Sequence, residues 1–532
     1  MGDTKKPTDD KHMVNRAAGL EEFERFRKRL QSLIDTDPAR AVVEARSIPS
    51  EAKIEGVLLS GLKAGILVDA GSCINNKEVI NEGLELFKGM LQKHPGRPEL
   101  HYNIGNGLIA LADQEPYTNI QWYLTTSAAR TEARNHFQAA ASLKGSESVA
   151  STALTNLGNA LWKAHRWAEA YDSYVKALNH DPTNGVASTG AAKILLRCIQ
   201  RSIGDREILL SVAARHLEIA NTHPDRIKEL AGARALEELS KLLEKPLKGG
   251  QMPDLNHATS YEKFVASHRL ALSPTIEGLD ISLKRWDSLV IQSFAEPVGG
   301  LHGIPPLFAM FNVLKADFLL ARHMAYQSLH GEMPDSGFYS DTLDYAVYGV
   351  KPATLALSQR ACMDVLDKIA VATAEYFGIE RKDIYFFTFW FERKKGQPLT
   401  WNPALSEHIK RGNTGIIALA ELSLDLGEKG FLREKKDFRH ASTHQFTVLH
   451  DLGCEPSRPS AYINHCRADD FASILIESLQ LTRAALLYFV DMVHIGEAEK
   501  QARLGQGVPL FVPSHHHIRG EDEKISGDPE ST

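Results

Sequence analysis

The chain has 532 residues, of which 43% are apolar and 24% charged, a balance typical of soluble globular proteins with two or three domains. Its 61 basic and 67 acidic residues give a net charge of −6, which argues against a protein that coats nucleic acid along its whole surface but allows a local basic cleft. No apolar run approaches the roughly 20 residues that span a bilayer, and the five cysteines form no disulfide framework, so we expect a cytoplasmic protein with no membrane partner.

Residues 1–18 are polar and are expected to be disordered, whereas residues 19–245 have the periodicity of paired helices. One helix pair carries a pattern of small and apolar residues closed by a proline. Its members are Leu154, Leu157, Gly158, Leu161, Ala170, Tyr174, Ala177 and Pro182. This spacing resembles a tetratricopeptide repeat, in which a small residue lies where two helices touch.

Two further repeat units are predicted before this pair. Ile104, Gly105 and Leu108 start one unit, and Phe137 falls in its second helix after an insertion containing "QEPYTNIQWYLTT". Phe87 and Pro95 fit the end of a third, degenerate unit. Such units bury their apolar faces only against their neighbours, so we expect a stacked array. Repeat arrays bind peptides or partner domains, and an unidentified protein partner or trigger is therefore expected on this region.

A second domain is expected after a linker at residues 246–257, which is rich in proline and glycine and has no apolar period. Residues 258–503 predict a helical bundle, and residues 504–532 a loose tail. Long helices are predicted from apolar residues at steps of three and four, beginning at Leu307, at about residue 353 and at Phe471. A fragment starting near residue 256 is expected to fold alone, and the aromatic stretch "IYFFTFWFERKKG" is interpreted as a strand or hairpin packed in the core.

The stretch "DFRHASTHQFTVLH", from residue 437, predicts another helix of this bundle, with Asp437 as its N-terminal cap. It places Arg439 five positions before His444, with His440 between them. About one such Arg-x-x-x-x-His match is expected by chance in a chain with this many arginines and 22 histidines. The preceding "LREKKD" adds local positive charge, so the stretch is either a solvated basic turn or a phosphate-directed catalytic pair.

An all-α bundle with Arg-[polar]-x-x-x-His in its penultimate helix resembles the HEPN superfamily (higher eukaryotes and prokaryotes nucleotide-binding domain). The longer stretches "YEKFVASHRLALSP" and "DTLDYAVYGVKPATLALSQRACMDVLDKIA" occur in the same order as in a large subfamily that accompanies helical repeats. Many members resemble metal-independent endoribonucleases of defence or toxin systems. The resemblance implies that Arg439 and His444 carry the chemistry and that His440, where asparagine is commoner, supports them.

These residue types suit RNA cleavage without a cofactor. An imidazole exchanges protons near neutral pH, and a guanidinium binds phosphate while keeping its charge. Cleavage needs a base, an acid and a cation on the phosphorane, and one chain supplies a single Arg439–His444 pair. A two-fold homodimer would bring two pairs into one cleft. Cleavage there would leave a 2′,3′-cyclic phosphate on the RNA. The alternative is a non-catalytic scaffold that mediates protein interaction or nucleotide binding.

No metal site is predicted. His450, Cys454, His465 and Cys466 have the side chains of metal ligands, but their spacing matches no zinc pattern. The run His515–His517 is interpreted as part of a solvated tail. No phosphate-binding Walker loop, glycine-rich dinucleotide motif or Gly-x-Ser-x-Gly elbow is present in the sequence.

Overall fold

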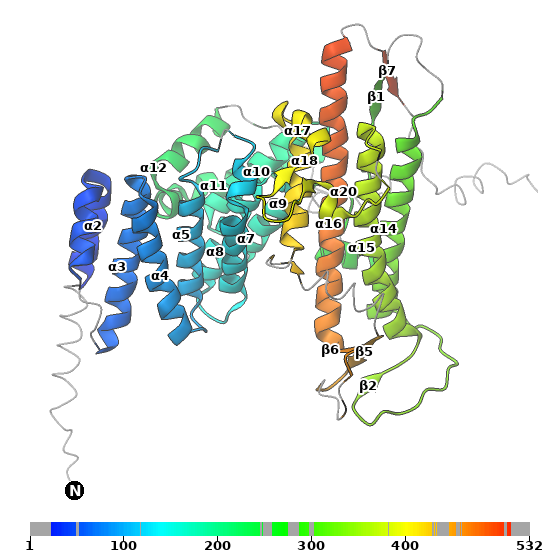
Figure 1. Cartoon of the computed structure of the whole chain (residues 1–532), viewed down its shortest axis with the longest axis horizontal. Helices are drawn as coiled ribbons and strands as arrows, with labels where there is room; N and C mark the ends of the chain where they lie inside the picture. Colours follow the sequence, from blue (N-terminus) through cyan, green and yellow to red (C-terminus); the bar gives the residue numbers. More distant parts are fainter. Residues whose placement is uncertain are drawn as a thin grey trace, which may run out of the picture. The chain divides into compact units, whose positions relative to one another are not determined.

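The computed structural model describes most of the chain between residues 23 and 511. The described residues are 23–48, 53–117, 119–244, 247, 258–274, 287–296, 303–380, 382–427, 430, 432–433, 446–453, 458, 460–504 and 508–511. The predicted linker at 246–257 lies almost entirely outside this set, so that boundary stays a prediction. Contacts divide the chain into two compact units, Met1–Leu157 and Gly158–Thr532. Helices dominate both units, which confirms the all-α class (Figure 1).

The first unit is a series of helices, several of them joined by short turns. Residues 23–36 are helical. The helices that follow are α2 (Pro38–Arg46), α3 (Lys53–Cys73), α4 (Lys77–Lys93), α5 (Pro98–Ala112), α6 (Trp122–Thr125) and α7 (Ser127–Ser142), and α8 (Glu147–Lys163) crosses the division between units. The insertion predicted inside the second repeat contains α6, a single short helix. Trp122 on α6 is buried, so this insertion belongs to the packed array.

Glycines at equivalent repeat positions allow paired helices to approach each other closely. A Cβ atom on Gly105 of α5 would lie 2.6 Å from the ring of Phe137 on α7. A Cβ atom on Gly158 of α8 would lie 2.6 Å from the ring of Tyr174 on the next helix. Contacts this short are not tolerated by a real side chain, so glycine is needed at both positions. The predicted repeat geometry is therefore present in two successive helical repeats.

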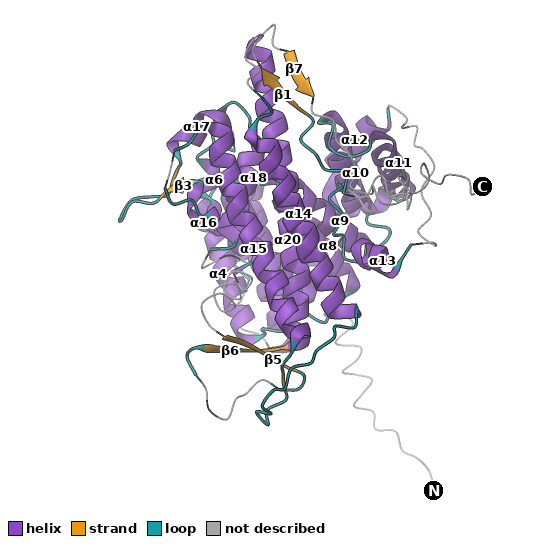
Figure 2. Ribbon diagram, turned by 90° about the vertical axis from the view of Figure 1, so that its right-hand side faces the viewer, coloured by secondary structure: helices purple, strands orange, loops and turns teal. Residues whose placement is uncertain are grey.

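The second unit contains the last repeat helices and the described helices that follow them. These are α9 (Trp167–His180), α10 (Gly185–Gln200), α11 (Arg206–Thr222), α12 (Pro224–Leu243), α13 (Ser260–Ser267), α14 (Pro306–His330), α15 (Val350–Phe377), α16 (Phe386–Phe389), α17 (Pro403–Lys410), α18 (Thr414–Asp425) and α20 (Ala468–Leu504). Helices α14, α15 and α20 pack together as the centre of the bundle (Figure 2).

The longest helix, α20, lies in the core of this unit. Its predicted apolar stripe, which includes Phe471, Leu479 and Phe489, is fully buried, as is the stripe of α14 that includes Phe318. By length and composition alone, Ala468–Arg503 could cross a membrane, but 72% of its apolar window is buried inside the protein. The helix is therefore packed as a core helix, and the predicted periodicity is confirmed.

Buried ion pairs join the repeat helix α9 to α18 and α20. Arg166, immediately before α9, pairs with Asp425 at the end of α18, and both side chains are fully buried. Asp172 on α9 accepts from Arg483 of α20 at 3.1 Å and from Arg269 at 2.6 Å. Removing a partner from such a pair leaves a buried charge uncompensated. A fragment starting near residue 256 would lose Arg166 and Asp172, so these contacts disfavour the expectation that it folds alone.

In the part of the chain that the structure describes, short strands accompany the helices. They form the pairs β1 (Ser293–Glu296) with β7 (Val508–Phe511) and β3 (Phe391–Glu392) with β4 (Thr400–Trp401), and a sheet of β2 (Ala346–Val347), β5 (Phe446–His450) and β6 (Ile463–Arg467). Of the aromatic stretch, Phe391–Glu392 form the expected strand, which pairs with β4 beyond the stretch, but Phe386–Phe389 form the short helix α16. Two predictions are wrong. The expected helix from Asp437 does not continue through residues 446–450, which are a strand, and the expected loose tail contains β7. Both segments are rich in β-branched and large apolar residues and gain a pairing partner far away in sequence.

Candidate functional site

The predicted pair Arg439 and His444, with His440, lies outside the described residues. The described residues on either side of this stretch make contacts with other elements. The backbone N–H of Leu432 donates to the carbonyl of Asp425 at the end of α18 at 3.0 Å. Strand β5 begins at Phe446, whose N–H donates to the carbonyl of Tyr462 at 2.9 Å. In sequence, the predicted catalytic stretch therefore lies between α18 and a small sheet.

That sheet has the order β2-β5-β6, with β2 antiparallel and β6 parallel to β5. It lies at one end of α20, which begins directly after β6 (Figure 1). In the register, His450 is opposite Ala346, and Val448 is opposite His465. Residues two apart on a strand share a face, so His450 and His465 are diagonal neighbours on one face of the sheet. The register alone explains why two histidines 15 positions apart in sequence meet.

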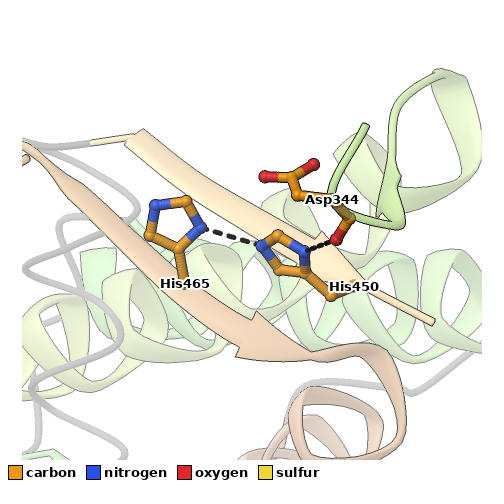
Figure 3. Close-up of side chains that lie close together, drawn as sticks. All are labelled: Asp344, His450 and His465. Atoms are coloured by element: carbon orange, nitrogen blue, oxygen red, sulfur yellow. Dashed lines mark hydrogen bonds between the residues drawn. The ribbon is translucent and has the colours of Figure 1, made fainter. Parts of the chain in front are cut away.

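Asp344, His450 and His465 form a compact cluster on this face (Figure 3). Nε2 of His450 lies 2.8 Å from Nδ1 of His465. Nδ1 of His450 lies 2.9 Å from the backbone carbonyl oxygen of Asp344. One possible ligand atom from each of the three residues lies within 4.8 Å of the others. Two imidazoles and a carboxylate thus converge on a single point.

Burial and hydrogen bonding distinguish the three members. His450 is fully buried, while Asp344 and His465 are half-buried. Nε2 of His465 is also shielded from solvent and has no hydrogen-bond partner among the described residues. A hydrogen bond from the Thr342 hydroxyl is the main cause that lowers the pKa of Asp344, with the nearby His450 adding to the shift. Asp344 is therefore a carboxylate at neutral pH.

Sequence reasoning set His450 and His465 aside, and it did not consider Asp344. The local spacing of the histidines gives no signal, because the third member lies 106 positions before His450. Only the pairing of β2, β5 and β6 brings these residues together. Cys466 lies on β6 but is not part of the cluster, and Cys454 lies outside the described residues.

Exposed apolar side chains surround the same sheet. Phe446, the first residue of β5, is 72% exposed, and Tyr462, directly before the adjacent strand β6, is 73% exposed. Leu343, beside Asp344, is 87% exposed. Large apolar groups gathered on one surface are typical of a binding site, whereas scattered ones need no explanation. The sheet therefore combines polar groups suited to chemistry with exposed apolar groups suited to a partner.

A pocket lies among the repeat helices of the same unit. Its lining includes Asn159 and Trp162 of α8, Tyr174 of α9 and the ion pair of Lys193 with Glu238. It offers both an aromatic surface and opposite charges. This pocket is where the described repeat helices could receive a ligand or a segment of a partner.

Comparison with known families agrees with this organisation. Residues 298–496 match the LA2681-like HEPN family. Residues 151–184, which include α9, match the tetratricopeptide repeat. The chain therefore carries a HEPN domain preceded by a tetratricopeptide repeat. No curated protein matches the chain.

The HEPN domain contains most of the features described above. Its range covers α14, α15, α18, the β2-β5-β6 sheet and most of α20. Arg439 and His444 fall inside it, as do Asp344, His450 and His465. The resemblance inferred from the sequence is confirmed at the level of the family, and the roles of individual residues stay predictions.

Proposed function

We propose that the protein is a metal-independent endoribonuclease effector of a cellular defence or toxin-type system, acting in the cytoplasm. The observation that carries this proposal is the Arg-x-x-x-x-His motif of Arg439 and His444 inside the matched HEPN domain. The tetratricopeptide repeat upstream supplies a surface for a partner or trigger. RNA is the proposed substrate because a basic segment presents a phosphate-binding arginine beside a proton-transferring imidazole.

In this proposal the nucleophile comes from the substrate. His444 removes the proton from the ribose 2′-hydroxyl or donates a proton to the departing 5′-oxygen. Arg439 stabilises the negative charge that develops on the phosphorus-bound oxygens, and His440 supports the pair. The products are a 2′,3′-cyclic phosphate and a 5′-hydroxyl. No metal takes part in this bond exchange.

The active form is proposed to be a homodimer formed at the end of the sheet. One pair of catalytic residues cannot supply base, acid and cation together, whereas two pairs in one cleft can. Support comes from the exposed rings of Phe446 and Tyr462, because Phe446 follows His444 by two residues. A two-fold contact over these rings would bring the Arg439–His444 stretch of one protomer close to that of its partner.

The proposal is tested by expressing the full chain in a cell and sequencing the RNA ends that accumulate. Arg439→Ala and His444→Ala should each abolish cleavage and toxicity, with an intermediate effect of His440→Ala. Matched controls are Arg503→Ala and His180→Ala, which replace an exposed arginine and an exposed histidine and should leave cleavage unchanged. Wild-type cleavage in both catalytic variants would reject the roles assigned to Arg439 and His444, and no cleavage by the full chain would favour the scaffold.

Chemistry is tested on the purified protein with a single RNA substrate. A substrate with 2′-deoxyribose at the cleaved position should resist, because it lacks the nucleophile. A ligase that needs a 5′-phosphate should not join the downstream product, because that product ends in a 5′-hydroxyl. Treatment with a kinase should make it a substrate for the ligase. Cleavage that continues on the 2′-deoxy substrate would contradict the role assigned to the 2′-hydroxyl.

A further inference from the structure

We propose that Asp344, His450 and His465 bind a divalent transition metal ion of the zinc type. The three side chains come from the segment before β2, from the end of β5 and from the middle of β6 (Figure 3). Their possible ligand atoms lie within 4.8 Å of one another. The site stands on this geometry and does not depend on whether the protein cleaves RNA.

The tautomer of His450 is set for binding a metal through Nε2. A carbonyl oxygen can only accept a hydrogen bond, so the contact from Nδ1 to the backbone oxygen of Asp344 requires the proton on Nδ1. The lone pair is then on Nε2, which faces His465. Histidines that bind metals commonly donate their other ring N–H to a backbone carbonyl in this way. The ring is fixed by the same segment that supplies the carboxylate.

The contact between the two rings shows where the ion would lie. Nε2 of His450 and Nδ1 of His465 are 2.8 Å apart, so one proton must be shared between two nitrogen lone pairs. A metal ion replaces that proton and is bound by both rings. The Asp344 carboxylate completes the set and offsets one of the two positive charges of the ion. The proton displaced from Nδ1 of His465 moves to Nε2 of the same ring, because a neutral imidazole keeps one N–H.

The donor set selects the class of metal. Two imidazole nitrogens and one carboxylate oxygen suit Zn²⁺ and its neighbours in the first transition row, whereas Mg²⁺ and Ca²⁺ prefer oxygen donors alone. Three protein ligands leave at least one position for water. Sites with this ligand count differ from closed structural zinc sites, which have four protein ligands.

A second histidine pair provides a natural control within the chain. Nδ1 of His101 on α5 lies 2.9 Å from Nδ1 of His136 on α7. Glu132, an acidic group that affects the pKa of His136, is paired with Lys88 at 3.2 Å. Among the described residues, three possible ligands meet only in the Asp344 cluster. Contact between two imidazoles is thus not enough, and the carboxylate makes the difference.

The ion would link three segments that are distant in sequence. It would join the segment before β2 to β5 and β6, and in sequence β5 comes just after Arg439 and His444. Its expected contribution is to fix the chain immediately after these two residues. It takes no part in the bond exchange proposed for cleavage.

The test is a zinc-binding titration of the full-length chain after treatment with a chelator. His515, His516 and His517 are first replaced by serine in every sample, so that the histidine run cannot bind zinc. Asp344→Asn keeps an oxygen acceptor for Thr342, and His465→Gln removes a half-buried ligand, so both should fold. His136→Gln is the matched control. Zinc affinity is measured against a chromophoric competitor, and Co²⁺ absorption reports the geometry.

One Zn²⁺ per chain is expected for the parent and for His136→Gln. Asp344→Asn and His465→Gln should bind at least about tenfold more weakly, since even changes to residues outside the ligand set cost 10–100-fold. Intense Co²⁺ bands should appear in the parent and disappear in His465→Gln. Equal zinc affinity in all four proteins, or no binding by the parent, would overturn the proposal.

Cleavage assays separate this site from the proposed nuclease. If the ion only positions the sheet, chelation lowers cleavage partly, and Zn²⁺ restores it while Mg²⁺ does not. Full cleavage in the chelator by a zinc-binding parent would overturn the positioning role but leave the nuclease intact. Complete loss of cleavage in Arg439→Ala with unchanged zinc affinity would show that the two sites act separately.

Discussion

Two regions of the second unit differ in how their charged and polar side chains are paired. Around α9, α18 and α20, buried charges are paired, as Arg166 is with Asp425 and Asp172 with Arg483. At the β2-β5-β6 sheet, a histidine nitrogen is buried without a partner among the described residues, and aromatic rings are exposed. Both regions contact α20, one along its length and one at its start (Figure 2).

The buried ion pairs have a structural role, whereas the polar and apolar groups at the sheet remain available for binding. Paired buried charges contribute little net stability, but losing one partner is costly, so they hold α9 in a fixed position against the bundle. Polar groups that remain unsatisfied, and apolar groups that remain exposed, gain energy only when something binds. We therefore expect substitutions in the ion-pair region to change stability, and substitutions at the sheet to change binding and activity.

The largest expected effect is from Asp172→Ala in the ion-pair region. Asp172 accepts from Arg269 and from the fully buried Arg483, so its loss leaves two guanidinium groups without this acceptor. The free energy of unfolding should fall by about 3–5 kcal/mol. Guanidinium denaturation followed by tryptophan fluorescence measures the change. Asp469→Ala, which removes an exposed pair with Arg467 at 3.6 Å, should change it by less than about 0.5 kcal/mol.

A smaller loss is expected where α18 and α20 touch. A Cβ atom on Gly415 would lie 2.5 Å from Cα of Met492, and backbone atoms cannot rotate away. Gly415→Ala should therefore destabilise the protein by about 1–3 kcal/mol. Gly89→Ala is the control, because nothing lies within 4 Å of its added methyl group, and it should gain up to about 1 kcal/mol. Equal melting temperatures for both variants would mean that α18 can shift away from α20.

Low pH should lower the free energy of unfolding by a smaller amount, because of a histidine close to the ion pairs. Burial is the main cause that lowers the pKa of His165 from 6.5 to about 4, and Arg197 lowers it further. The folded state binds this proton less readily than the unfolded state, so the stability is present above pH 6.5 and lost as the pH falls towards 4. At pH 5 the loss should be on the order of 1 kcal/mol for this half-buried ring. His165→Asn, which tolerates the φ of 60° there, should lose less stability between pH 7 and 5, and identical losses would contradict this cause.

Much of the fold follows from local sequence, whereas most of the candidate site does not. The apolar periods of α14 and α20 and the glycine of each repeat act within one or two helices, so they are visible in the sequence. Strand pairing is not local, since β1 pairs with β7 from the other end of the unit. The cluster of Asp344 with His450 depends on such pairing. Arg483 interrupts an apolar run, and its partner Asp172 could not be named without the structure. Arg439 and His444 were found by their motif, and their roles stay predictions.

The smallest expected change in stability is at the exposed rings of the sheet. Phe446→Ser and Tyr462→Ser replace side chains that are 72% and 73% exposed, so the free energy of unfolding should change by less than about 0.5 kcal/mol. If these rings form the two-fold contact, the double variant should be a monomer in light scattering and should lose cleavage at low protein concentration. Val313→Ser with Leu320→Ser replaces apolar residues on α14 that are 52% and 57% exposed, and this variant should keep the parent's mass. A double variant at Phe446 and Tyr462 that remains a dimer would place the contact elsewhere, and a monomeric parent that still cleaves RNA would remove the need for a shared cleft.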